Sequence, residues 1–206
     1  MRETRWHFIR HAPVDNPDGR VYGASDQPAN TSDTATFEIL ANHLPNNAIA
    51  VVSHLKRTLQ TMEALQNAGL DVKGPIIDRR LSEQDFGDWV GLTYEEINVQ
   101  YRETYRRFWL SPVTERAPGG ESFLDVVLRV QKSLEELSKR FMDRDIICIA
   151  HGGSIRAALS LALDVDPSKV FPFSTCNLST TLIDRLHPEP NFSGGWRIRG
   201  TNIPPI

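Results

Sequence analysis

The residues Trp6-His-Phe-Ile-Arg-His11 form a short apolar run that ends directly in an arginine and a histidine. Two later runs have the same form: Ala48–Val52 leads into Ser53-His54, and Asp145–Ala150 leads into His151. Each run is short enough for a buried strand, and apolar residues at helical spacing separate the runs. Strands that alternate with helices predict an α/β fold with a mostly parallel sheet.

The helical segments complete this layout. The clearest helix begins near Ser122, which has capping-box spacing to Asp125. Its apolar face steps by four and three residues through Phe123, Val127, Val130, Leu134, Leu137 and Phe141. Further helices are predicted over 31–44, 55–65 and 155–163, and a further strand over 178–183. We therefore predict a three-layer α/β/α, doubly wound, mostly parallel sheet, formed by a single domain over residues 1–206.

Two segments depart from the alternation of strands and helices. Residues 74–118 hold many aromatic and charged side chains and predict a helical excursion around 90–117, which serves as a lid or as one wall of a substrate pocket. The tail from Leu186 contains four prolines and three glycines in 21 residues. This composition predicts little regular structure there beyond Trp196–Arg199.

The bulk composition excludes several classes of partner. A net charge of −3 provides no basic field for nucleic acid or an anionic membrane. No window approaches the roughly 18 apolar residues of a membrane span. The N-terminal residues lack the apolar region of a signal peptide, and two cysteines form no disulfide framework. The expected location is therefore the cytoplasm.

The three strand ends predict a phosphate site. Ligands bind at the carboxyl ends of strands in open α/β sheets, so Arg10, His11, Arg57 and His151 are expected to share a pocket. Guanidinium groups match phosphate oxygens, and Gly152, at the start of a predicted helix, adds backbone amide donors. Nearby arginines keep a histidine neutral and therefore nucleophilic. A carboxylic acid facing the pocket would protonate the leaving group.

Five motifs in order give the chain a resemblance to a known family, the histidine phosphatase superfamily with its phosphoglycerate mutase-like fold. The resemblance extends to about Ile183. The matching segments are Arg10-His11-Ala12, Ser53–Thr61, Leu81–Gly91, Pro118-Gly-Gly-Glu-Ser122 and Ala150–Arg156. Each motif alone is a weak signal, whereas five in register are specific.

The resemblance implies a role for each matching residue. His11 becomes the phosphoryl acceptor, and Glu83 becomes the acid for the leaving group and then the base for water. Arg10, Arg57 and His151 bind the phosphoryl group. The implied activity is that of a metal-independent phosphomonoesterase, without a cofactor, acting on a small phosphate ester through a phosphohistidine intermediate.

Departures from the family pattern concern the loop after His11. Ala12 replaces the usual glycine and would resist a positive φ angle. The segment 13–26 lacks the Glu-Thr pair of the mutases and resembles the α-ribazole phosphatase branch. Asn16, Tyr22 and Gly23 thereby become candidate substrate contacts.

Several alternatives remain open at this point. A phosphoglycerate mutase is disfavoured, because the insertion before Pro118 is short, and a non-catalytic phospho-ligand binding module is disfavoured by the intact nucleophile and acid. Asp85 and Asp88 compete with Glu83 for the role of the acid. A zinc site is disfavoured, because no histidine pair has helical ligand spacing with a third ligand in view. The substrate and the oligomeric state stay undetermined.

Overall fold

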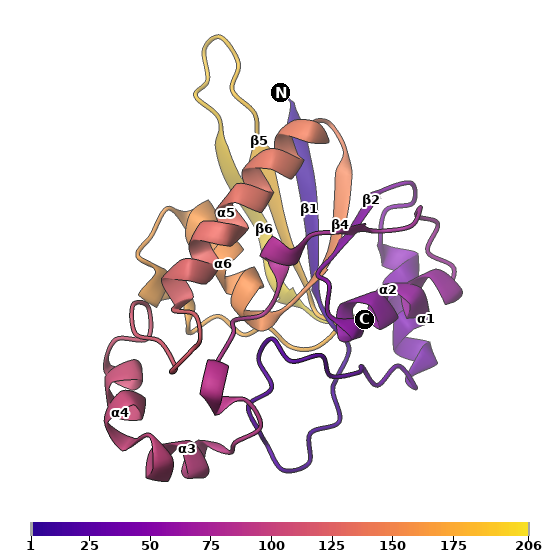
Figure 1. The fold of residues 1–206 in the computed structure, drawn as a ribbon. Helices are drawn as coiled ribbons and strands as arrows, with labels where there is room; N and C mark the ends of the chain where they lie inside the picture. The colour runs from indigo at the N-terminus through magenta and orange to yellow at the C-terminus, as the bar shows by residue number, and fades with distance from the viewer. Residues whose placement is uncertain (1, 206) are drawn as a thin grey trace.

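A computed structural model describes residues 2–205 and shows one six-stranded sheet in the order β3-β2-β4-β1-β5-β6 (Figure 1). The strands are β1 Glu3–Arg10, β2 Ile49–Val52, β3 Ile76–Ile77, β4 Asp145–Ala150, β5 Thr180–Leu186 and β6 Gly195–Ile203. The α-helices are α1 Thr34–His43, α2 Lys56–Asn67, α3 Tyr94–Gln100, α4 Arg102–Leu110, α5 Phe123–Arg140 and α6 Gly152–Leu163. The predicted α/β class is confirmed.

Parallel pairing aligns the ends of three neighbouring strands. β4 lies between β1 and β2 and runs parallel to both. Arg10 is paired with Ala150, so His11 and His151 follow their strands at the same edge of the sheet. β2 ends one residue earlier, at Val52 opposite Ile149. The chain must cross over to insert β4, and this switch in strand order brings the three predicted turns together.

Helices cover both faces of the sheet, which confirms the three layers (Figure 1). Alternating side chains divide the core: Trp6 and Phe8 of β1 pack with α5 and α6, whereas Ile9 packs with α1 and α2. The period of two along a strand produces this division. The predicted α5 is confirmed, including the reciprocal capping box between Ser122 and Asp125.

The excursion is confirmed as two short helices, α3 and α4, which lie at the end of the molecule where β1, β2 and β4 terminate (Figure 1). Thr93 caps α3 through a capping box with Glu96. Trp89, Ile97 and Phe108 bury their side chains in a small core of this region. The excursion therefore has its own packing beside the strand ends.

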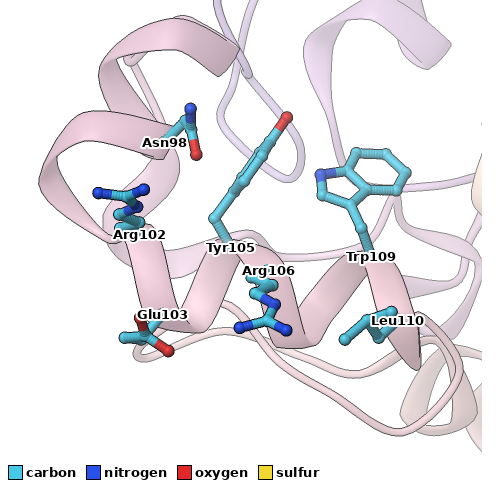
Figure 2. Close-up of a pocket in the computed structure, with 7 residues that line it drawn as sticks. All are labelled: Asn98, Arg102, Glu103, Tyr105, Arg106, Trp109 and Leu110. Carbon is cyan, nitrogen blue, oxygen red and sulfur yellow. The ribbon is translucent and has the colours of Figure 1, made fainter.

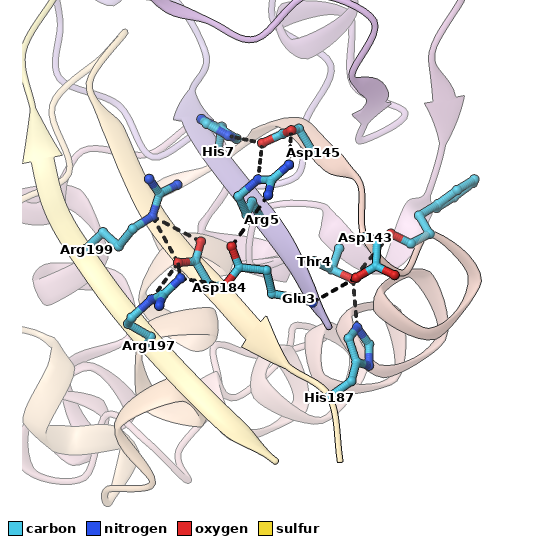
Figure 3. A network of polar contacts seen from close by, with 11 residues as sticks. Glu3, Thr4, Arg5, His7, Asp143, Asp145, Asp184, His187, Arg197 and Arg199 are labelled. Carbon is cyan, nitrogen blue, oxygen red and sulfur yellow. Dashed lines mark hydrogen bonds and ion pairs between the residues drawn. The ribbon is translucent and has the colours of Figure 1, made fainter. Parts of the chain in front are cut away.

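The C-terminal tail is more ordered than its composition predicts. The expectation of little structure beyond Trp196–Arg199 is wrong, because β6 extends over Gly195–Ile203 and pairs antiparallel with β5. Figure 3 shows that Asp184 of β5, fully buried, binds Arg197 and Arg199 of β6. A buried carboxylate needs such partners. The open edge of β5 also supplies backbone hydrogen-bond partners that the tail residues do not find among themselves.

No helix within residues 2–205 is long and apolar enough to cross a membrane.

Candidate active site

His11 is buried immediately after β1, and its backbone and ring are both held. Its amide donates to Ala150 O at 3.0 Å, and its carbonyl accepts from Asn177 Nδ2 at 2.7 Å. Ring atom Nδ1 lies 2.7 Å from Ala12 O. A carbonyl only accepts, so Nδ1 carries the proton and Nε2 keeps its lone pair. Nε2 is buried without a hydrogen-bond partner, as an unoccupied nucleophile would be.

Burial is the main reason that His11 is neutral. The pKa of His11 is lowered to about 3, mainly by desolvation; the bond to Ala12 O opposes this shift, and the charges of Arg57 and Arg10 add smaller contributions in the same direction as burial. The arginine effect expected from the sequence is therefore present but smaller than the effect of burial. A neutral imidazole over the whole physiological pH range suits a nucleophile.

This lowered pKa makes stability depend on pH. The unfolded chain, in which His11 has a pKa near 6.5, binds a proton below that pH, whereas the folded protein does not until about pH 3. The free energy of unfolding therefore falls as the pH falls from 6.5 towards 3. For His11 alone we expect a loss of about 2 kcal/mol between pH 7 and pH 5.

Urea denaturation at the two pH values measures this loss in the wild type and in His11→Asn. We expect His11→Asn to show a smaller difference between pH 7 and pH 5. The exposed His43, replaced by asparagine, is the matched control and keeps the wild-type difference. Equal differences in all three proteins would contradict the assigned burial of a neutral His11.

His151 follows β4 and lies against His11, with ring centroids 5.1 Å apart. Its Nδ1 accepts from Arg57 Nε at 3.3 Å, and its Nε2 lies 2.7 Å from Ser53 Oγ. An arginine only donates, so His151 is neutral here with its proton on Nε2. Complete burial lowers the pKa of His151, and the repulsion that a second protonated ring at His11 would exert lowers it further, as do the charges of Arg57 and Arg10.

Arg57 extends from the first turn of α2 into the pocket and is fully buried. Nη1 donates to Ser25 O at 2.7 Å and Nη2 to Gly23 O at 2.6 Å. Among residues 2–205, no carboxylate lies within 4.0 Å of Arg57, and the same holds for Arg10. Two guanidinium groups without carboxylate partners create a positive pocket in a chain of negative net charge.

Unpartnered polar atoms mark the space that an anion fits. Arg10 donates from Nη1 to Thr175 O at 2.7 Å, but its buried Nε has no partner. Thr175 Oγ1 is also buried without a partner, as is His11 Nε2. Unsatisfied buried polar atoms are costly, and a phosphoryl group can accept from the two donors among them, Arg10 Nε and Thr175 Oγ1, while His11 Nε2 keeps its lone pair.

Glu83 reaches the same space from the segment before the excursion. Its Oε1 accepts from Gly153 N and from Gln84 N, both at 3.0 Å. A Cβ at Gly153 would overlap with Oε1, and a Cβ at Gly152 would lie 3.9 Å from Oε2. Glycines at the start of α6 thus let the carboxylate approach the helix closely. Asp85 instead accepts from Gly87 N within its own loop, and Asp88 is exposed.

A cavity of about 570 Å³ continues from Glu83 towards α3 and α4, which confirms the excursion as one wall of a pocket. Its lining residues are Val21, Glu83, Gln84, Phe86, Trp89, Tyr94, Phe108, Trp109, Pro112, Phe123, Gly153, Arg156 and Phe171. A second hollow of about 650 Å³ lies on the surface of α3 and α4, and its lining includes neither Glu83 nor Gly153 (Figure 2). His11 and His151 line neither hollow, but the first one adjoins their site through Glu83 and Gly153 at the start of α6.

The proposed substrate contacts have structural partners in the loop. Asn16 uses its side chain within the loop, binding the backbone of Arg20 through both Nδ2 and Oδ1. The Tyr22 ring lies 5.1 Å from the guanidinium carbon of Arg57, and Gly23 supplies a carbonyl to that same side chain. Tyr22 and Gly23 thus contact Arg57, whereas Asn16 holds its own loop, and direct contact of these three residues with substrate stays a prediction.

Ala12 causes no strain at its position. Its φ angle is not positive, its side chain is buried in the core under α1 and α2, and its amide donates to Thr61 Oγ1 at 2.9 Å. The sequence motifs include Ser53 and Thr61, but they do not reveal that Ser53 contacts His151 or that Thr61 contacts Ala12. Thr175 and Asn177 lie outside every motif, and only the fold of the loop before β5 brings Thr175 to Arg10 and Asn177 to His11.

Within residues 2–205, no group of three or more histidine, cysteine, aspartate or glutamate side chains is placed to hold a metal ion.

Comparison with known proteins agrees with this geometry. The family model of the histidine phosphatase superfamily, branch 1, matches residues 6–196. Phosphoserine phosphatase 1 of Hydrogenobacter thermophilus is 34% identical over 180 residues, which cover 85% of this chain and 84% of that protein. Glucosyl-3-phosphoglycerate phosphatase of Mycobacterium tuberculosis is 34% identical over 177 residues, covering 79% of this chain and 76% of the relative.

A solved structure shares the fold over almost the full chain. The putative alpha-ribazole-5'-P phosphatase from Escherichia coli has a TM-score of 0.80, with 97% of this chain and 96% of that chain covered. Its sequence identity of 21% shows the fold alone. With a family model that spans most of the chain and relatives that are phosphatases, the chain belongs to branch 1 of the histidine phosphatase superfamily and is a phosphatase.

Proposed function

We propose that the protein hydrolyses a small phosphate monoester in the cytoplasm, without a metal, through a phosphohistidine on His11. The observation that carries this proposal is the buried, unpartnered Nε2 of His11, deprotonated because Nδ1 donates to Ala12 O. The lone pair of Nε2 attacks phosphorus, and the ester P–O bond breaks. The Ala12 carbonyl then stabilises the positive charge that develops on the ring.

The other side chains divide the remaining work. Arg10 and Arg57 neutralise the equatorial phosphoryl oxygens, together with the amides at the start of α6, including that of Gly152. A phosphoryl dianion beside His151 favours its doubly protonated form, in which Nδ1 no longer accepts from Arg57 Nε and instead donates to the phosphoryl group. Protonated Glu83 donates its proton to the departing oxygen. As a carboxylate, Glu83 then removes a proton from the water that breaks the P–N bond and releases inorganic phosphate.

Trapping the intermediate tests this proposal directly. We expect brief incubation with ³²P-labelled phosphate ester in EDTA, followed by alkaline quenching, to label the protein with an acid-labile, base-stable phosphate. His11→Asn should take up none, and the His43→Asn control should be labelled like the wild type. Turnover that EDTA abolishes, or labelling that persists without His11, would contradict the proposal, and phosphate binding without turnover would favour a binding module.

A further inference from the structure

The cavity beside Glu83 is larger than a small leaving group needs. Its volume of about 570 Å³ falls within the range of about 300–1,000 Å³ found for sites that hold drug-sized ligands. A three-carbon alcohol would leave most of that space filled with water. The cavity therefore fits a leaving group with a bulky extension.

The far wall of the cavity is aromatic. Phe86, Trp89, Phe108 and Trp109 line it, and Trp89 packs edge-on against Phe108 at 5.1 Å. Trp109 remains 53% exposed, although it lies in contact with Phe108. An exposed aromatic ring in a concave wall gains free energy when an apolar ligand covers it. The extension of the leaving group is expected to be apolar or aromatic.

Arg156 is the positive group in this lining, and it has no carboxylate partner. Its Nε donates to Phe173 O at 3.0 Å, whereas no acidic side chain of residues 2–205 lies within ion-pair distance. Its Nη1 lies 3.3 Å from the point where a Cβ on Gly152 would stand, close to Glu83 and Thr175. Arg156 is half-buried, and this loss of solvation lowers the pKa of its guanidinium group.

We propose that the substrate is a phosphomonoester whose leaving group carries an anion, such as a carboxylate, close to the ester oxygen and an apolar or aromatic extension beyond it. Arg156 binds the anion, and the aromatic wall holds the extension. This inference rests on the proposed hydrolysis at His11 and assigns Arg156 as a specificity-determining residue.

Three aryl phosphates with phenols of similar acidity separate these features: phenyl phosphate, 3-carboxyphenyl phosphate and 1-naphthyl phosphate. For the wild type we expect kcat/KM for the carboxylated ester to exceed that for phenyl phosphate by about tenfold or more, since a charge-assisted hydrogen bond is worth this much. The added ring of the naphthyl ester should raise kcat/KM by about tenfold.

Variants assign each preference to its residue. Arg156→Gln should reduce the carboxyphenyl-to-phenyl ratio to near one, mainly through KM, and Arg156→Lys should restore part of it. Trp109→Ala should lower the naphthyl-to-phenyl ratio and leave the carboxyphenyl ratio in place. Arg140→Gln, exposed on α5, is the matched control and keeps both ratios. Circular dichroism confirms that each variant is folded.

The outcomes distinguish the two proposals. If Arg156→Gln slows all three esters equally, Arg156 merely supports Glu83 and the inference is wrong. A wild type without either preference overturns it as well. If no ester is hydrolysed in a His11-dependent manner, the proposed function itself fails.

Discussion

Replacing His11 with asparagine is expected to lower kcat for phosphomonoester hydrolysis by at least about 10⁴-fold, the scale of loss for an essential nucleophile. Asparagine lacks a lone-pair nitrogen at the position of Nε2, whereas its amide can still donate to Ala12 O. The backbone contacts of residue 11 with Ala150 and Asn177 do not involve the side chain and persist. The loss therefore concerns the chemical step.

Steady-state kinetics with p-nitrophenyl phosphate, with His43→Asn as the control, measures this effect. Calorimetric titration with inorganic phosphate measures binding separately, and we expect the affinity to change far less than kcat, because Arg10 and Arg57 remain. Activity within tenfold of the wild type would place the nucleophile elsewhere. A parallel loss of phosphate binding would point to a collapsed pocket instead.

Glu83→Gln is expected to lower kcat for an alkyl phosphate by about 10²–10⁴-fold, the typical contribution of general acid–base catalysis. The amide oxygen can still accept from Gly153 N and Gln84 N, so the side chain should keep its place. It has no acidic proton to give to an alkoxide. Asp88→Asn, at an exposed position in the same segment, is the matched control.

The leaving group provides the decisive comparison for Glu83. Because p-nitrophenolate departs without protonation, the first turnover of p-nitrophenyl phosphate should be much less affected by Glu83→Gln than that of an alkyl phosphate. Rapid-mixing measurement of the p-nitrophenol burst reveals this difference. Gly153→Ala should reproduce the alkyl phosphate defect, because its Cβ overlaps with Glu83 Oε1. An equal defect in the first turnover of both esters would show that Glu83 acts by positioning alone.

The choice of Glu83 over its acidic neighbours shows where local sequence stops being informative. Glu83, Asp85 and Asp88 lie in one loop, and their spacing predicts no difference in role. The structure separates them because only Glu83 meets the start of α6, a segment 70 residues away in sequence. A contact between residues so far apart in the sequence produces no pattern in the residues around Glu83 that could be recognised beforehand.

The ordered tail and the state of His11 have similar explanations. β6 forms because β5 offers an open edge and Asp184 offers a buried carboxylate, neither of which the tail's own composition encodes. The tautomer of His11 depends on the direction of the neighbouring Ala12 carbonyl, which follows from the packing of the strand end. The sequence predicted a neutral histidine through its arginines, whereas burial contributes the larger shift.

Local patterns indicated which strands end in functional side chains and predicted the amphipathic α5 with its capping box, because apolar periodicity and residues at strand ends are local properties. The motifs also predicted a shared pocket for Arg10, His11, Arg57 and His151 and favoured Glu83 as the acid. Only the folded chain shows which ring nitrogen of His11 is free, that Glu83 contacts the start of α6, and that Arg156 and an aromatic wall adjoin it. Those features are contacts between segments far apart in the chain, and they depend on the crossover that inserts β4 between β1 and β2.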